Sequence, residues 1–117
     1  MNIEEYRNYC MEKKGVTEET PFDNETLVFK VMGKIFALTN MHLFTSVNLK
    51  CNPEDAIALR EKFDAIIPGY HMNKKHWNTL LLDGTLPEKL IYACIDDSYN
   101  LVASGLTKKE KEQLKNL

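Results

Sequence analysis

The segment from Pro68 to Thr79 holds the side chains of this chain that are best suited to chemistry. It contains two histidines, two lysines, two asparagines, a tyrosine and a tryptophan. No acidic residue occurs between Ala65 and Leu82, so the segment is locally cationic although the whole chain has a net charge of −2. Cationic, amide and aromatic groups in one short stretch suit an anion, a nucleic-acid backbone or an unpaired base.

Each polar residue type in this segment has a role in contacting nucleic acid. Lysines contact phosphates, asparagines bond to phosphates or base edges, and histidines donate hydrogen bonds. Aromatic rings stack on unpaired bases. The sequence therefore predicts a nucleic-acid or anion contact surface made of Tyr70, His71, Asn73, Lys74, Lys75, His76, Trp77 and Asn78.

Tyr70 and Trp77 also allow a structural interpretation. Large amphipathic rings commonly anchor a loop in the core, which would leave Lys74 and Lys75 at the solvated tip. Even then Asn73 and the two lysines would be available for contacts. The residue types leave both interpretations of the two aromatic side chains open.

The histidine spacing does not indicate a metal or catalytic site. His71 and His76 are five residues apart, so a helix would not place them on one face and a strand would point them in opposite directions. No carboxylate in the segment completes a zinc site, and no phosphate-binding loop, dinucleotide fingerprint or nucleophile elbow occurs in the chain. We expect no metal, no cofactor and no enzymatic activity.

An enzyme with His71 or His76 as general acid or base is still an alternative hypothesis. It would require these histidines to converge in a closed pocket with a carboxylate such as Asp83. Histidines and Lys74 that project from a convex edge would instead favour nucleic acid or protein as the partner.

The three cysteines, Cys10, Cys51 and Cys94, are far apart and form no C-x-x-C pair. Their odd number and spacing argue against a disulfide framework and a zinc ribbon. We interpret them as reduced thiols that pack like small hydrophobic residues.

Length and composition indicate one ordinary globular domain spanning residues 1–117. The chain has 117 residues, of which 44% are hydrophobic and 27% charged, enough for a single core. No apolar stretch approaches the roughly 20 residues of a membrane span, and the acidic start Met1–Glu5 differs from a signal peptide. We therefore expect a cytoplasmic protein without membrane contact. Its pI of about 5.9 is well below that of an obvious nucleic-acid binder. Any binding of DNA should be weak and salt-dependent, because only Lys74, Lys75 and a few distant bases can neutralise phosphates.

Capping residues and apolar periodicity predict four helices. N-cap Asn or Thr residues, an N-terminal proline and acids in the first turn mark their starts. Lysines followed by Gly15 indicate the end of the first helix, and Gly105 the end of the third. The predicted helices are residues 3–14, a helix starting at Pro53 that buries Ala56, Leu59 and Phe63, a helix that begins with a capping box at Thr85–Glu88 and ends at Gly105, and a short charged helix after Thr107.

Side chains that alternate between apolar and polar with a period of two predict the strands of an antiparallel sheet. Residues 27–32 and 35–39 form a hairpin around Gly33-Lys34, residues 44–50 a third strand and residues 77–82 another. Residues 17–25 are expected to be an acidic connection. These elements indicate an α+β domain whose sheet is covered by helices on one face, with the open face as its working surface.

The run from Tyr70 to Thr79 resembles the Y-H-M-N-K-x-H-W-N-T hallmark of the MmcQ/YjbR-like family of small bacterial proteins. The resemblance implies an α+β fold with an antiparallel sheet flanked by helices, similar to the CyaY/frataxin-like arrangement and also described as a double-wing DNA-binding-like fold. Further segments resemble the family pattern in order along the chain: Pro21-Phe22, Phe29–Val31, Gly33–Leu38, Leu49–Pro53, Ile67–Gly69, Leu82–Gly84, Leu86-Pro87 and Ser98–Val102.

The resemblance also implies a DNA-binding protein. We expect a non-enzymatic domain that contacts phosphates through Tyr70–Asn78, with Lys74 and Lys75 as phosphate contacts and Trp77 as a buttress or stacking platform. A protein or small-anion interaction module that uses the same loop is the first alternative. The uncharacterised enzyme described above is the second.

Overall fold

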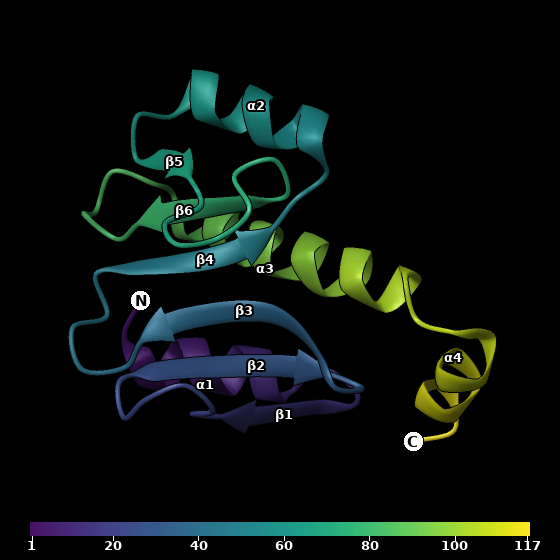
Figure 1. Cartoon of the computed structure of the whole chain (residues 1–117). Helices are drawn as coiled ribbons and strands as arrows, with labels where there is room; N and C mark the ends of the chain where they lie inside the picture. The colour runs from purple at the N-terminus through teal and green to yellow at the C-terminus, as the bar shows by residue number, and fades with distance from the viewer.

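The computed structural model describes all residues from 1 to 117 and shows a six-stranded sheet with four helices (Figure 1). All neighbouring strands are antiparallel, in the order β1-β2-β3-β4-β6-β5. This confirms the predicted α+β fold. None of the helices has the length and apolar composition to cross a membrane. The elements are α1 (Ile3–Met11), β1 (Val16–Glu19), β2 (Thr26–Val31), β3 (Lys34–Asn40), β4 (Ser46–Lys50), α2 (Pro53–Lys62), β5 (Ile66–Pro68), β6 (Trp77–Leu81), α3 (Glu88–Ser104) and α4 (Lys108–Lys115).

Three of the four helix starts follow the predicted capping chemistry. Asn2 and Glu5 form a reciprocal capping box at α1, Thr107 and Glu110 form another at α4, and the Asn52 side chain accepts a hydrogen bond from the backbone of α2. Each side chain satisfies a backbone N–H that has no partner within its helix.

Two helix boundaries differ from the prediction. The first helix ends at Met11, not at residue 14, and the chain then turns through Gly15, which has φ of 74°. The Lys13 ammonium pairs with Asp96 of α3 at 2.5 Å. The prediction of a capping box at Thr85 is wrong. The Thr85 hydroxyl donates to the Asp83 carboxylate at 2.6 Å instead, and α3 begins after Pro87 without a side-chain cap.

Strand β1 was not predicted, and the segment expected to be an acidic connection is partly an edge strand. Val16–Glu19 pairs with Val28–Val31 of β2. Its acidic side chains are balanced by neighbours: Glu18 pairs with Arg7 at 2.6 Å and Glu19 pairs with Lys30 at 2.7 Å. Charged residues on an edge strand also discourage pairing with other chains.

The hairpin between β2 and β3 is confirmed, but its turn lies one residue earlier than predicted. Met32 and Gly33 are the two loop residues, with φ of 49° and 81°. Positive φ at both positions matches the twist of a two-residue hairpin, and glycine adopts it at no steric cost.

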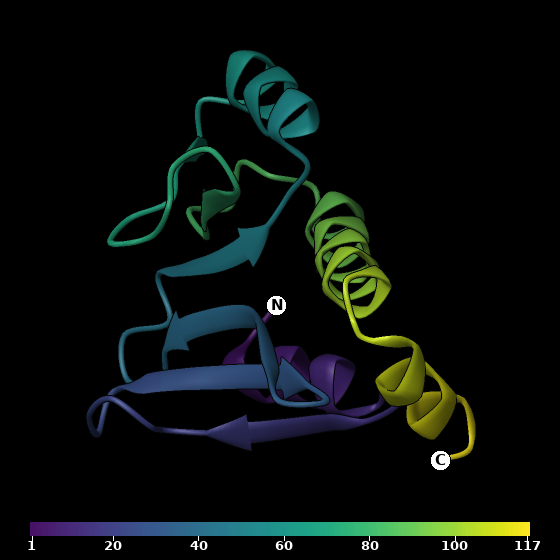
Figure 2. The same cartoon turned by 45° about the vertical axis from the view of Figure 1, so that its right-hand side comes forward.

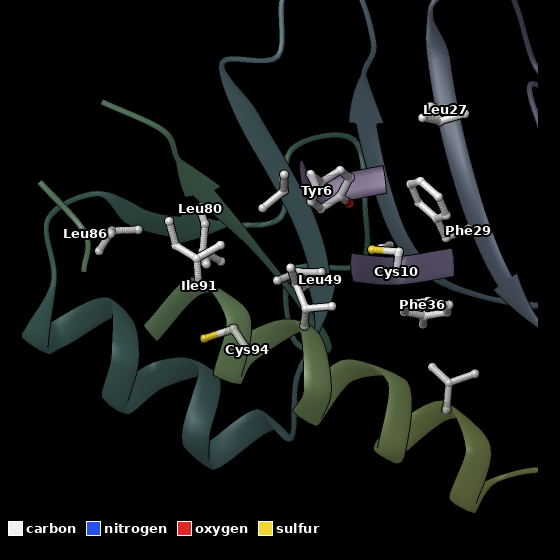
Figure 3. Packing of buried hydrophobic residues seen from close by; sticks show 14 of the residues in the cluster. Tyr6, Cys10, Leu27, Phe29, Phe36, Leu49, Leu80, Leu86, Ile91 and Cys94 are labelled. Carbon is white, nitrogen blue, oxygen red and sulfur yellow. The ribbon is translucent and has the colours of Figure 1, made fainter. Parts of the chain in front are cut away.

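The main core lies between the sheet and the helices α1 and α3. Tyr6 and Cys10 of α1 meet Phe29 of β2, and the rings of Tyr6 and Phe29 pack edge-to-face at 5.5 Å (Figure 3). Ile91 and Ile95 of α3 extend this core toward β4 and β6. Both helices lie on the same side of the sheet (Figure 2).

The opposite face of the sheet is not simply open, which corrects the sequence-based expectation. Val28, Leu38 and Trp77 form a second, smaller cluster on that face, and Ile35 and Met72 pack against it. Met72 belongs to the connection between β5 and β6, which lies across the sheet from α3 (Figure 2). This connection therefore covers part of the face that was expected to be solvated.

Candidate nucleic-acid contact loop

The contact loop, defined here as residues 69–76, has a backbone fixed by hydrogen bonds to β6. The Gly69 amide donates to the Trp77 carbonyl at 2.9 Å, and the Trp77 amide donates to the Asn73 carbonyl at 2.9 Å. The Tyr70 amide donates to the Thr79 hydroxyl at 2.9 Å. The loop thus presents its exposed side chains from a defined backbone.

The loop begins at a close approach between two backbone segments. A side-chain Cβ at Gly69 would lie 2.8 Å from the Trp77 Cβ and 2.9 Å from the Trp77 carbonyl oxygen. Real Cβ atoms do not come so near to backbone, so glycine is needed here for space.

We expect Gly69→Ala to lower the free energy of unfolding by about 1–2 kcal/mol, because the added methyl pushes the loop away from β6. Chemical denaturation measures the change. Gly105→Ala is the matched control: a Cβ there would lie 3.5 Å from the Val102 carbonyl, an ordinary contact. Equal midpoints for the two variants would contradict the steric argument.

Two side chains that sequence reasoning treated as free contacts also hold the loop together. Asn73 accepts hydrogen bonds at its Oδ1 from the amides of Lys75 at 2.9 Å and His76 at 3.3 Å. The Lys74 ammonium donates to the Gly69 carbonyl at 3.2 Å. Asn73 therefore acts first as a turn former, and its Nδ2 group alone is free of this role.

Arg60 of α2 belongs to the site although the sequence did not single it out. Its guanidinium donates to the Lys74 carbonyl at 3.1 Å and to the Ala56 carbonyl at 3.2 Å. It joins the contact loop to α2 and adds a permanent positive charge beside it. No local pattern signals this contact, since the two residues are fourteen positions apart.

The outer side of the loop presents an aromatic ring and positive charge together. Tyr70 is 65% exposed, and its ring centroid lies 4.0 Å from that of His71. His71 has φ of 57°, a left-handed conformation that turns the chain at the loop tip. Lys74 and Lys75 are both exposed. The structural interpretation of Tyr70 as a core anchor is wrong.

Trp77 and Asn78 do not lie on this surface, which corrects their assignment as contact residues. Trp77 is 9% exposed and packs with Val28 and Leu38, so its interpretation as a core anchor is confirmed. Asn78 is 1% exposed and donates to the Ala56 carbonyl of α2 at 3.3 Å. Adjacent residues of a strand point to opposite faces, so β6 buries both side chains, one on each side of the sheet.

The two histidines do not meet a carboxylate in a pocket. Neither His71 nor His76 lines either of the two main cavities. Asp83 lines a different cavity, beside Phe63 and Leu86, and hydrogen bonds from Thr85 lower the pKa of its carboxyl group. No group of three His, Cys, Asp or Glu residues is arranged to hold a metal ion.

The three cysteines are free thiols, as expected, and none forms a disulfide. Cys10 and Cys94 are buried, and this burial raises the pKa of each thiol to about 12. Both stay protonated at neutral pH and behave as small hydrophobic residues. Cys51 is half-buried and directly follows β4.

Known proteins are similar in sequence to most or all of this chain. Residues 11–101 match the model of the YjbR family. The chain is 35% identical to the protein YjbR of Escherichia coli K12 over the full length of both. It is 38% identical to YbdF of Escherichia coli O157:H7 over 96 residues, which cover 81% of this chain and 79% of that one.

Two solved structures have the same fold. The crystal structure of the Deinococcus radiodurans protein DR2400, with its DUF419 domain, superposes with a TM-score of 0.91 at 40% identity and covers 97% of this chain and 88% of that one. The crystal structure of a Pseudomonas syringae protein has a TM-score of 0.73 at 32% identity, with 87% and 99% covered. The chain therefore belongs to the YjbR family.

Proposed function

We propose that this protein binds single-stranded nucleic acid weakly through the contact loop. The observation that supports the proposal is the exposed Tyr70 ring, packed on His71 and flanked by Lys74 and Lys75 on a hydrogen-bonded loop. An aromatic platform beside cationic groups is the usual arrangement for holding an unpaired base and its phosphates. Binding of this kind needs no catalytic group.

Single-stranded nucleic acid suits the loop better than a duplex. Tyr70 is the exposed ring of the candidate surface, since Trp77 is buried. A ring can stack on an unpaired base at once, whereas a paired base must first leave its helix. None of the four helices lies in the contact loop, so the loop has no helix to place in a major groove.

The charge on the loop limits the affinity. Lys74, Lys75 and Arg60 are the cationic side chains tied to it. The Lys74 ammonium donates one hydrogen bond within the protein, which leaves donors free for a phosphate. Two to three phosphate contacts correspond to a slope of log K against log salt of about −1.4 to −2 on single strands.

Fluorescence anisotropy with a labelled mixed-sequence DNA strand at low salt tests the stacking role. We expect Tyr70→Ala to weaken binding roughly tenfold, because a base–aromatic stack is lost. Phe22→Ala is the matched control, since Phe22 is 67% exposed and lies in the connection between β1 and β2. It should bind as the unmodified protein does.

The salt dependence tests the lysines. We expect Lys74→Ala combined with Lys75→Ala to flatten the salt slope by about 1.4, from the loss of two phosphate contacts. The double variant Lys108→Ala with Lys109→Ala, at exposed lysines where α4 begins, should leave the slope unchanged. The proposal would be contradicted if no binding is detected at high micromolar protein, or if the two double variants change the salt slope equally. Either result would favour a protein or small-anion interaction module.

A further inference from the structure

Strand β4 presents two partly exposed polar side chains, Asn48 and Lys50, beside the contact loop. Leu49 between them belongs to the main core, so its two neighbours point to the opposite face of the sheet. The register agrees with this, because Lys50 pairs with Trp77, whose side chain packs on that opposite face. The contact loop lies on the same side of the sheet, away from α3 (Figure 2).

Two hydrogen bonds connect Asn48 to the contact loop. The Tyr70 amide donates to the Thr79 hydroxyl at 2.9 Å, and this hydroxyl donates to the Oδ1 of Asn48. Asn48 is therefore held close to the backbone of the exposed aromatic residue. The bond from Thr79 uses Oδ1 alone, which leaves the Nδ2 group of Asn48 to donate to a ligand.

Lys50 supplies positive charge on this face of the sheet. It takes part in none of the four ion pairs of the structure. The far half of the same face has its charges already paired, since Lys30 of β2 meets Glu19 of β1 at 2.7 Å. A phosphate beyond the contact loop thus meets an unpaired cation over β4 and a neutralised pair over β1 and β2. The charges favour a path along β4.

We propose that the nucleic-acid strand held at Tyr70 continues over the sheet along β4, where Asn48 donates a hydrogen bond to a base edge and Lys50 binds a phosphate. This inference rests on the proposed function and extends its site from the contact loop to the sheet. Asparagine commonly bonds base edges and lysine phosphates. The two residues are two positions apart on one strand, about 7 Å, so one contacts a base while the other contacts a neighbouring phosphate.

The salt dependence of binding tests the lysine. With a labelled mixed-sequence DNA strand, Lys50→Ala should flatten the slope of log K against log salt by about 0.7, the loss of one phosphate contact on a single strand. Lys89→Ala is the matched control, because Lys89 is an exposed lysine of α3, on the other side of the sheet. It should leave the slope unchanged.

A change of the amide to a carboxylate tests the hydrogen bond. Asn48→Asp keeps an oxygen that accepts from Thr79 but removes the donor and adds a charge that repels phosphate, so it should weaken binding roughly tenfold. Asn100→Asp makes the same change at an exposed position of α3 and should weaken binding by no more than about twofold.

Nuclear magnetic resonance of the unmodified protein tests the contact directly. The Nδ2 signals of Asn48 should shift when the DNA strand is added, while those of Asn100 should stay in place. If Asn48→Asp does not fold, these signals and the salt slope of Lys50→Ala still decide.

The outcomes separate this inference from the proposed function. If Tyr70→Ala weakens binding, but Lys50→Ala keeps the salt slope or the Nδ2 signals of Asn48 do not move, the path along β4 is overturned and the contact loop remains a binding site. If the unmodified protein binds no DNA, both proposals fail.

Discussion

Replacing Trp77 with alanine is expected to lower the free energy of unfolding by about 3–5 kcal/mol, the usual cost of deleting a large buried aromatic side chain. Trp77 is 9% exposed and fills the smaller cluster with Val28 and Leu38. Met72 of the contact loop packs against the same cluster. The substitution leaves a cavity beneath the loop and removes the support that holds it on the sheet.

Chemical denaturation followed by circular dichroism measures this effect. Tyr70→Ala is the control, because Tyr70 lies in the same loop but is 65% exposed and should change stability by no more than about 0.5 kcal/mol. An unchanged midpoint for Trp77→Ala would contradict its role as an anchor. The pair also separates stability from binding, since Tyr70→Ala should lose affinity for DNA without losing stability.

Strand β6 faces the contact loop on one side of the sheet and the main core on the other. Trp77 and Thr79 support the contact loop on one face, the first by packing and the second by accepting a hydrogen bond from Tyr70. On the other face, Asn78 donates to the Ala56 carbonyl of α2 and Leu80 belongs to the main core. The alternation of a single strand thus supports both faces of the sheet within four consecutive residues.

Features set by short-range chemistry could be predicted from the sequence. The caps at Asn2, Asn52 and Thr107 depend on residues at most three positions away. The hairpin depends on one glycine, Gly33, that allows a positive φ. The composition of the contact loop was equally visible, because its chemistry lies in consecutive residues.

Features set by long-range packing could not be predicted. Val16–Glu19 becomes a strand because β2 offers it an edge, not because its own residues demand one. Burial of Asn78 depends on the Ala56 carbonyl of α2, twenty-two residues away. The same limit applies to Arg60, whose contact with the contact loop exists only after α2 has packed beside it.

A hydroxyl group takes the place of a sheet hydrogen bond at the end of strands β3 and β4. Regular pairing of these strands includes Ala37 with Leu49 and stops there, and the two strands diverge beyond this point (Figure 1). Ser98 of α3 lies at the opening. Its hydroxyl accepts a hydrogen bond from the Lys50 amide at 2.8 Å and donates one to the Phe36 carbonyl at 2.5 Å.

We expect Ser98→Ala to lower the free energy of unfolding by about 2–3 kcal/mol, because the change leaves a buried carbonyl and a partly buried amide without their partner. Ser104→Ala is the matched control on the same helix, since the exposed Ser104 hydroxyl donates only to the Leu101 carbonyl of its own turn. That control should change stability by no more than about 0.5 kcal/mol. Chemical denaturation compares the two variants, and hydrogen exchange at the Lys50 amide should accelerate in Ser98→Ala alone. Equal stability of the two variants would show that the hydroxyl bridge does not hold the diverging strands together.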